Sequence, residues 1–279
     1  MENINSEAQE IDVYYSESSD YLLYDNHYHY CHELIFVTNG SCDFVISGKK
    51  YVVSENQLVI ISNLERHENV VQSGLPYKRF VLLLPHYFCM MMIREPLLLS
   101  ILIHRPENFS HVIHLDSEQA EKITLFFQNM LEEFSGRLAF WSTRCAILVV
   151  DMLLGLYREK SSVFPNNLNI EGLGDAIKIQ EYIARNIEQK ITLDTLAKHF
   201  YINKFHLSRM FKAVTGFSFK DYLVLYRLNE SKNLLLHTNL SITDISQMVG
   251  YTDVNHFIRI FCQREGVTPL QYRKRMTAC

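Results

Sequence analysis

The sequence HLSRMF at residues 206–211 returns fifty residues later as HFIRIF at residues 256–261. Each copy is followed five residues on by a glycine, Gly216 or Gly266, and a tyrosine stands six residues after each glycine. Upstream of these stretches the offset is 49 residues, so the second copy has one additional residue at its turn. Each copy has the pattern of a short helix, a tight turn and a second helix, which predicts two helix-turn-helix units.

Apolar residues at helical spacing predict the buried face of the second helix in each unit. These residues are Leu207, Met210, Phe211 and Val214 in the first copy, and Phe257, Ile260 and Phe261 in the second. Asn203 and Asp253 are the expected N-caps of these helices. The outward side chains are the predicted DNA-binding residues: Lys204, Phe205, His206, Ser208, Arg209 and Lys212 in the first copy, and Asn255, His256, Arg259 and Gln263 in the second.

Arginine and asparagine can form bidentate contacts with guanine and adenine edges in the major groove. Lys212 and Lys220 are interpreted as phosphate contacts, which position the protein without selecting sequence. A helix over residues 219–236 would be about 27 Å long and would hold the two second helices close to one DNA turn apart, about 34 Å. The alternative for a single helix is an ordinary solvated face, but two copies at matched spacing favour DNA binding.

Charge divides the chain into two parts. Residues 1–170 hold 12 Lys and Arg against 21 Asp and Glu (12 − 21 = −9), and residues 171–279 hold 15 against 10 (15 − 10 = +5). A basic module joined to an acidic one indicates a nucleic-acid partner. Residues 161–174 are rich in Ser, Asn, Pro and Gly and are the expected linker. The predicted domains are therefore residues 1–160 and residues 175–279.

Residues 191–275 resemble the DNA-binding domain of the AraC/XylS family of bacterial transcription regulators. The resemblance is carried by HLSRMFKAVTGFSFKDYLVLYRLNESKNLLL at residues 206–236 and SITDISQMVGYTDVNHFIRIFCQREGVTPLQYR at residues 241–273. It implies an all-α domain of seven helices with two recognition helices in successive major grooves. Cys262 and Gln263 stand where the family usually has a basic pair, which implies weaker phosphate contact by the second unit.

The acidic half has the pattern of a β-sandwich or barrel followed by helices. Short strands are expected at 8–12-residue spacing, over residues 34–38, 42–46, 51–53, 57–61, 67–72 and 79–84. Asp116 and Gln119 predict a capping box for a helix over residues 117–134. Residues 138–157 are apolar nearly all round, so this second helix is expected to be buried from two sides. The barrel or the preceding helix would cover one side, and a second subunit could cover the other, which makes these helices the expected dimerisation pair.

Histidines near the first strands suggest a ligand site. His27, His29, Glu33 and Gly40 follow the pattern H-x-H-x3-E-x6-G, and His67 lies two strands later. This resembles the first cupin motif and the histidine of the second, so the expected fold class is α+β, with a cupin-like β-barrel and dimerisation helices before an all-α double helix-turn-helix domain. Three imidazoles and one carboxylate could hold Zn, Fe, Mn or Ni.

The second cupin motif is degraded, because Ser62 and Leu64 stand where the pattern has Pro and Gly. Hydrogen-bonded pocket histidines are therefore the preferred interpretation, and no cofactor is expected. The predicted effector-binding residues are His27, His29, Glu33, His67 and Tyr24. Tyr24 belongs to a tyrosine-rich N-terminal arm that could form a lid over a hydroxylated effector such as a sugar, or could simply fill half-exposed strand edges.

The remaining sequence features exclude secreted and membrane-spanning classes of protein. The first twenty residues lack a signal peptide, and the longest apolar stretches, residues 96–103 and 145–157, are shorter than the roughly 18–20 residues of a membrane span. The six cysteines show no CxxC spacing, so reduced thiols in the cytoplasm are expected.

The expected function is a transcription regulator, without enzymatic activity, that binds double-stranded DNA. It would be an activator controlled by a small-molecule effector and working as a homodimer with RNA polymerase, away from membranes. Two alternatives remain open: a metal-dependent cupin enzyme with a DNA-binding tail, and a ligand-independent dimeric regulator.

Overall fold

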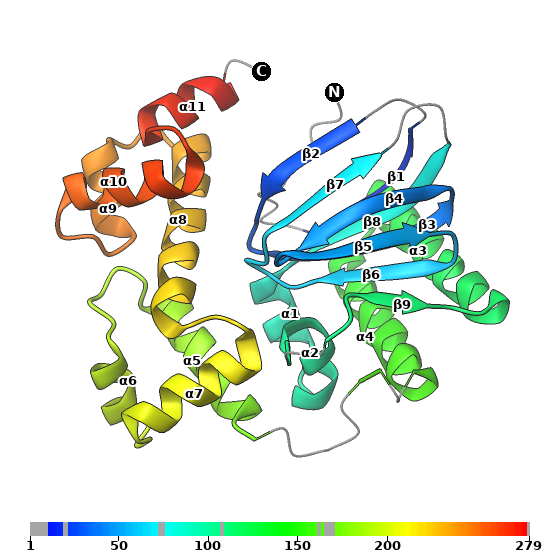
Figure 1. Ribbon diagram of the computed structural model, residues 1–279, viewed down its shortest axis with the longest axis horizontal. Coiled ribbons are helices and arrows are strands. Elements are labelled where there is room, and N and C mark those ends of the chain that lie inside the picture. Colours follow the sequence, from blue (N-terminus) through cyan, green and yellow to red (C-terminus); the bar gives the residue numbers. More distant parts are fainter. Residues whose placement is uncertain are drawn as a thin grey trace. The chain divides into compact units, whose positions relative to one another are not determined.

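The computed structural model describes residues 11–18, 22–71, 76–106, 109–160, 163–164 and 171–277, and the side chains of residues 22–26 and 275–277 lie outside that description. The chain forms two compact units, Met1–Leu173 and Gly174–Cys279. Strands fill most of the first unit and helices the second (Figure 1). None of the helices in the described parts combines the length and apolar character that a membrane span requires.

Two antiparallel sheets form the centre of the first unit. One sheet has the strand order β1 (Asp12–Ser18), β8 (Tyr77–Pro85), β3 (Cys31–Asn39), β6 (Gln57–Ile61) and β9 (Val112–His114). The other has the order β2 (Leu22–His27), β7 (His67–Val71), β4 (Ser41–Ile46) and β5 (Lys49–Ser54). The sheets lie face to face (Figure 1), and the predicted β-rich, cupin-like first domain is confirmed.

Alternation along β3 shows how both faces of its sheet are buried. Ile35 and Val37 belong to the apolar core between the sheets. Phe36 points the other way and stacks on Phe127 of a covering helix with ring centroids 6.3 Å apart, and Phe80 of β8 does the same at 5.2 Å. A sheet covered on both faces can use unbroken apolar runs, as β6 does at residues 58–61, which are all buried.

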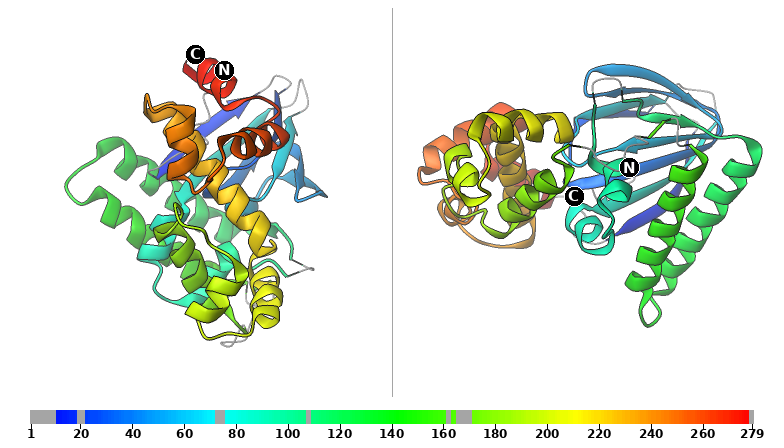
Figure 2. Two further views of the ribbon diagram at one scale, coloured as in Figure 1. Left: turned by 90° about the vertical axis from the view of Figure 1, so that its left-hand side faces the viewer. Right: turned by 90° about the horizontal axis from the view of Figure 1, so that it is seen from below.

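The described residues of the first unit also form four helices: α1 (His86–Met92), α2 (Pro96–Ile103), α3 (Ser117–Gly136) and α4 (Trp141–Glu159). The capping box predicted for α3 is present, with Gln119 N donating to Asp116 Oδ1 at 2.9 Å. Helix α4 packs beside α3 (Figure 2) but begins three residues later than expected, because Arg137 and Phe140 adopt left-handed conformations (φ 41° and 67°).

The expectation that α4 is buried from two sides does not hold within a single chain. Ile147 on α4 is 54% exposed and Leu125 on α3 is 58% exposed. An open groove of about 390 Å³ runs along the two helices, with Ile123, Leu148 and Met152 among its lining residues. Helix α4 therefore has more apolar surface than α3 and the sheet cover.

The second unit has seven helices among its described residues: α5 (Leu173–Arg185), α6 (Leu193–His199), α7 (Lys204–Thr215), α8 (Phe219–His237), α9 (Ile242–Met248), α10 (Val254–Glu265) and α11 (Pro269–Thr277). Helices α6 and α7 form the first helix-turn-helix unit, and α9 and α10 form the second. The predicted long helix between them is α8. Its side chains pack against both units, with Phe211 of α7 contacting Tyr222 and Leu228 joining the core around α9 and α10.

The turns of the two helix-turn-helix motifs both contain a residue with positive φ, but that residue differs between them. Tyr201 and Gly250 occupy equivalent positions, and both have positive φ, at 56° and 83°. A Cβ added at Gly250 would overlap the Arg227 side chain and the Ile187 carbonyl. The Tyr201 side chain is instead 96% exposed. Glycine is therefore required in the second turn, whereas the first accepts a side chain at the cost of local strain.

Candidate functional site

The first predicted recognition helix presents its polar side chains to solvent. Asn203 caps α7, its Oδ1 accepting from Phe205 N at 2.9 Å and His206 N at 3.3 Å. The predicted inward residues are all buried: Leu207, Met210, Phe211 and Val214. The predicted outward residues are exposed except for the half-buried Ser208: Lys204, Phe205, His206, Arg209 and Lys212. Phe205 is 72% exposed, which is unusual for an aromatic side chain without a partner surface.

The second recognition helix has the same length of 12 residues and the same arrangement. Asp253 caps it, accepting from Asn255 N at 2.9 Å. Phe257 and Phe261 are buried, and Ile260 is half-buried. The four predicted DNA-binding residues are all exposed: Asn255, His256, Arg259 and Gln263. Each helix-turn-helix motif therefore has a solvent-facing helix with one arginine in its middle, which suits recognition of bases in the major groove.

Two arginine side chains connect α8 to neighbouring segments through hydrogen bonds to backbone carbonyls. Arg227 donates to the Ile187 carbonyl at 3.1 Å and to the Gln189 carbonyl at 2.7 Å. Arg273 of α11 donates to the Leu235 and Leu240 carbonyls at 3.0 and 2.8 Å. Because these guanidinium groups are used in internal contacts, we assign them to structure and not to the candidate DNA face.

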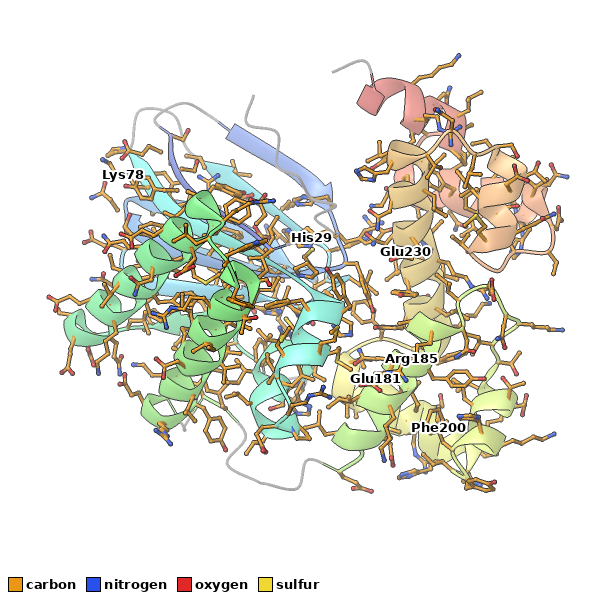
Figure 3. All side chains as sticks on the ribbon, turned by 180° about the vertical axis from the view of Figure 1, so that it is seen from behind. His29, Lys78, Glu181, Arg185, Phe200 and Glu230 are labelled. Atoms are coloured by element: carbon orange, nitrogen blue, oxygen red, sulfur yellow. The ribbon has the colours of Figure 1, made fainter. Side chains whose placement is uncertain are left out.

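In the first unit, the predicted effector residues meet at one place. His27 ends β2, His29 lies in the connection to β3 (Figure 3), Glu33 lies on β3, and His67 begins β7. One ligand atom from each of the three histidines lies within 4.8 Å of the others. Glu33 Oε2 lies 3.3 Å from His29 Nε2 and 3.0 Å from His67 Nε2. The structure therefore brings four of the five predicted residues together.

The fifth predicted residue, Tyr24, pairs through its backbone with Asn69 in the β2–β7 ladder, and its side chain lies outside the described residues. A small cavity adjoins the cluster, with a volume of about 10 Å³. Tyr14 of the tyrosine-rich arm also lines it, and the sequence reasoning missed two further lining side chains, Asn69 and Arg79. The signals were present, because Asn69 shares the strand parity of His67 and Arg79 is a charge in an apolar strand.

The cluster is strongly coupled electrostatically. Burial raises the pKa of Glu33, but the facing His29 and His67 imidazoles outweigh it and hold the pKa well below its ordinary value. Burial lowers the pKa of His29. Burial also lowers the pKa of His67, but the nearby Glu33 carboxylate outweighs it, so the net shift is upward. The two imidazoles therefore favour ionisation of Glu33, and the Glu33 carboxylate favours protonation of His67.

A second buried ion pair lies beside the cluster. The Glu65 side chain, 5% exposed, accepts from Arg105 Nε at 3.1 Å, from the Ser62 backbone N–H at 2.6 Å and from His111 Nε2 at 3.1 Å. Burial opposes ionisation of Glu65, but Arg105 and then His111 lower its pKa to about 2. The Glu65 backbone carbonyl accepts from His67 Nδ1 at 2.9 Å. One residue thus links the buried ion pair to the histidine cluster.

Comparison with known proteins agrees with both halves of the chain. Residues 10–139 match the AraC-like ligand binding domain, and residues 196–275 match a helix-turn-helix domain. The transcriptional activator RhaS of Escherichia coli is 24% identical over 257 residues, which cover 90% of this chain and 88% of RhaS. The bifunctional transcriptional activator and DNA repair enzyme AdaA of Bacillus subtilis is 34% identical over 96 residues.

The relatives differ in how much of their own length the match to this chain covers. The match to AdaA covers 34% of this chain and 46% of AdaA, so this chain spans less than half of that relative. ToxT of Vibrio cholerae, solved with an unsaturated fatty acid bound, superposes with a TM-score of 0.60 and 15% identity over 94% of each chain. This likeness shows a common two-domain fold. The two matched domains and the likeness to RhaS along 90% of this chain show that the chain belongs to the AraC family of transcription regulators.

Proposed function

We propose that this protein is an effector-controlled transcription regulator that reads DNA with α7 and α10. The observation that carries the proposal is the pair of exposed recognition helices, each with a buried apolar face and a central arginine (Arg209 and Arg259). The net charge of +5 on residues 171–279 favours contact with a polyanion.

Selection of bound sequences from a random DNA library, followed by affinity measurements, tests this reading. Arg209→Ala and Arg259→Ala should each lose about 1–3 kcal/mol of discrimination at one base position. Lys212→Ala should weaken all sequences about equally and reduce the salt dependence. Arg185→Ala is the matched control, because Arg185 is exposed on α5 and not on a recognition helix. Unchanged sequence preference in Arg209→Ala would refute the assignment of α7.

For the sensor, we propose that the effector contacts His27, His29, Glu33 and His67, with Tyr24 as a further contact. Support comes from the burial of a polar, charge-bearing cluster inside the unit that matches the AraC-like ligand binding domain. Effector binding regulates only if it favours one state of the protein over another. A thermal-shift screen of metabolites, repeated with Glu33→Gln, identifies ligands whose binding depends on this cluster.

We propose activation as the direction of regulation, with RNA polymerase as the partner, because RhaS, a relative that matches 90% of this chain, is a transcriptional activator. Transcription in vitro with RNA polymerase and the selected DNA sequence tests the sign. An increase in transcript supports activation, and a decrease shows repression. The family relationship favours a regulator over the metal-dependent cupin enzyme.

We further propose that the protein is a homodimer that pairs through the open face of α3 and α4. The exposed Leu125 and Ile147 support this, because they lie on neighbouring helices that share an open, partly apolar groove, and contiguous apolar surface is typical of an interaction site. Sedimentation at micromolar concentration should show a dimer that Leu125→Glu converts to a monomer. A wild-type protein that sediments as a monomer refutes the proposal.

A further inference from the structure

One of the predicted DNA contacts, Lys204, is held by an acidic side chain of the neighbouring helix. Lys204 is the first residue of α7, and its Nζ lies 2.8 Å from Asp194 Oδ1 and 2.9 Å from Asp194 Oδ2. Asp194 lies in the first turn of α6. The two side chains are 45% and 65% exposed, so the ion pair lies at the surface where the first recognition helix begins.

The capping of α6 does not need Asp194. The N-cap Thr192 forms a capping box with Thr195, because Thr195 N donates to Thr192 Oγ1 at 3.1 Å and Thr192 N donates to Thr195 Oγ1 at 2.9 Å. The first-turn acid of α9, Asp244, is used differently, since its Oδ2 accepts from the hydroxyl of its own N-cap residue at 2.6 Å. Both carboxylate oxygens of Asp194 are directed at Lys204 instead.

Asp194 is the only acidic residue in the sequence of the first helix-turn-helix motif. Residues 193–215 hold four Lys and Arg against one Asp (4 − 1 = +3), whereas residues 242–265 of the second motif hold two Arg against three Asp and Glu (2 − 3 = −1). The second motif also lacks this ion pair, because Thr243 and Val254 stand at the positions of Asp194 and Lys204. The first motif is therefore the more attractive of the two for phosphate, and its one acidic side chain compensates one of its four cations.

We propose that Asp194 lowers the affinity of the regulator for DNA by holding Lys204 away from the phosphate backbone. A lysine ammonium that is compensated by a carboxylate at 2.8 Å attracts phosphate less and releases fewer counterions from DNA. Phosphate contacts are common to all sequences, so Asp194 affects the strength of binding and not the sequence preference. The inference rests on the proposed function, because it concerns the same contact between α7 and DNA.

Asp194→Asn in the full-length protein tests this inference. Fluorescence anisotropy measures its binding to the selected DNA sequence at salt concentrations from about 50 to 200 mM. The variant should bind about two- to fivefold more tightly, the range expected for an exposed ion pair. The slope of the logarithm of the binding constant against the logarithm of the salt concentration should steepen by about 0.9, the contribution of one further phosphate contact. Asp194→Ser removes the same charge with a smaller side chain and should give the same result.

Two controls separate the ion pair from a general effect of charge. Glu181→Gln removes a negative charge from α5, outside both helix-turn-helix motifs, where Glu181 pairs with Arg185 at 3.9 Å (Figure 3). This variant should leave the affinity and the salt slope nearly unchanged. In a Lys204→Met background, Asp194→Asn should also leave the salt slope nearly unchanged, because no lysine is left for the substitution to release. A merely structural role of Asp194 would not make the change in slope depend on Lys204.

Circular dichroism shows whether each variant keeps its helices. Unchanged affinity and slope in folded Asp194→Asn overturn the inference, and so does an equal gain in Glu181→Gln or an equal change of slope in the Lys204→Met background. Weaker binding by Asp194→Asn also overturns it, because Asp194 would then orient Lys204 towards DNA. Each of these results, obtained with a wild type that binds the selected sequence, leaves the proposed function intact. Absence of sequence-specific binding by the wild type and by every variant refutes the proposed function and, with it, this inference.

Discussion

Replacing Glu65 by Gln should destabilise the first unit by about 3–5 kcal/mol, the usual cost of leaving one partner of a buried ion pair uncompensated. The structure supports this magnitude, because Glu65 and Arg105 are each only 5% exposed in their side chains. The difference between the ordinary glutamate pKa of 4.5 and the value of about 2 at Glu65 corresponds to about 3 kcal/mol. The variant keeps the size of the side chain, so the loss reports charge and not volume.

Urea unfolding at pH 7 in the presence of a chelator measures this change. Trp141 is the only tryptophan in the chain and lies at the start of α4, so its fluorescence follows the first unit alone. The midpoint should fall while the slope with urea stays constant. Glu118→Gln is the control, because Glu118 pairs with Lys122 at 3.0 Å but is 80% exposed, and an exposed pair is worth at most about 1 kcal/mol. A loss below about 1 kcal/mol in Glu65→Gln would refute the reasoning.

Two further perturbations have clear expected outcomes. Burial lowers the pKa of His86 from 6.5 to about 3, so between those pH values only the unfolded chain takes up the proton and stability falls as pH falls. Between pH 6.5 and 5 this group should cost about 2 kcal/mol, and His86→Met should remove that part of the pH dependence of urea unfolding. Gly250→Ala should cost about 2–4 kcal/mol, since it combines backbone strain with steric overlap. Gly48→Ala, which has similar φ but open space around it, should cost only about 1–2 kcal/mol. Thermal unfolding by circular dichroism measures both glycine variants, and equal losses would contradict the overlap at Gly250.

The repeat in the second half was predictable because its signals are local. The caps at Asn203 and Asp253 and the buried faces of α7 and α10 follow from residue spacing within a few turns, and the structure confirms them. Strand β6 also has the predicted bounds, residues 57–61. Strands β1 and β2 were not predicted, because their sequences DVYYSES and LLYDNH mix polar and apolar residues without a clean alternation.

The buried polar contacts join residues that are far apart in the sequence, so only some of them could be predicted. The cupin-like spacing of His27, His29 and Glu33 predicted the histidine cluster. Nothing in the sequence pointed to the pairing of Glu65 with Arg105, forty residues later. An isolated acidic residue has no periodicity, and its burial depends on how α2 packs against the sheet. The predicted start of α4 was wrong because residues 138–140 are apolar and extend the apolar run, whereas Phe140 adopts a left-handed backbone conformation that ends the helix there.

The two turns give the halves of the DNA-binding domain different freedom to diverge. Gly250 is enclosed by Arg227 and Ile187, so almost any replacement there would be removed by loss of folding before its effect on DNA could be selected. Tyr201 extends into solvent beside α7, so substitutions there change the surface next to the first recognition helix while the fold survives. Duplicated units that began alike would therefore acquire new operator preferences at unequal rates, with the first half drifting faster and the second conserving the older specificity.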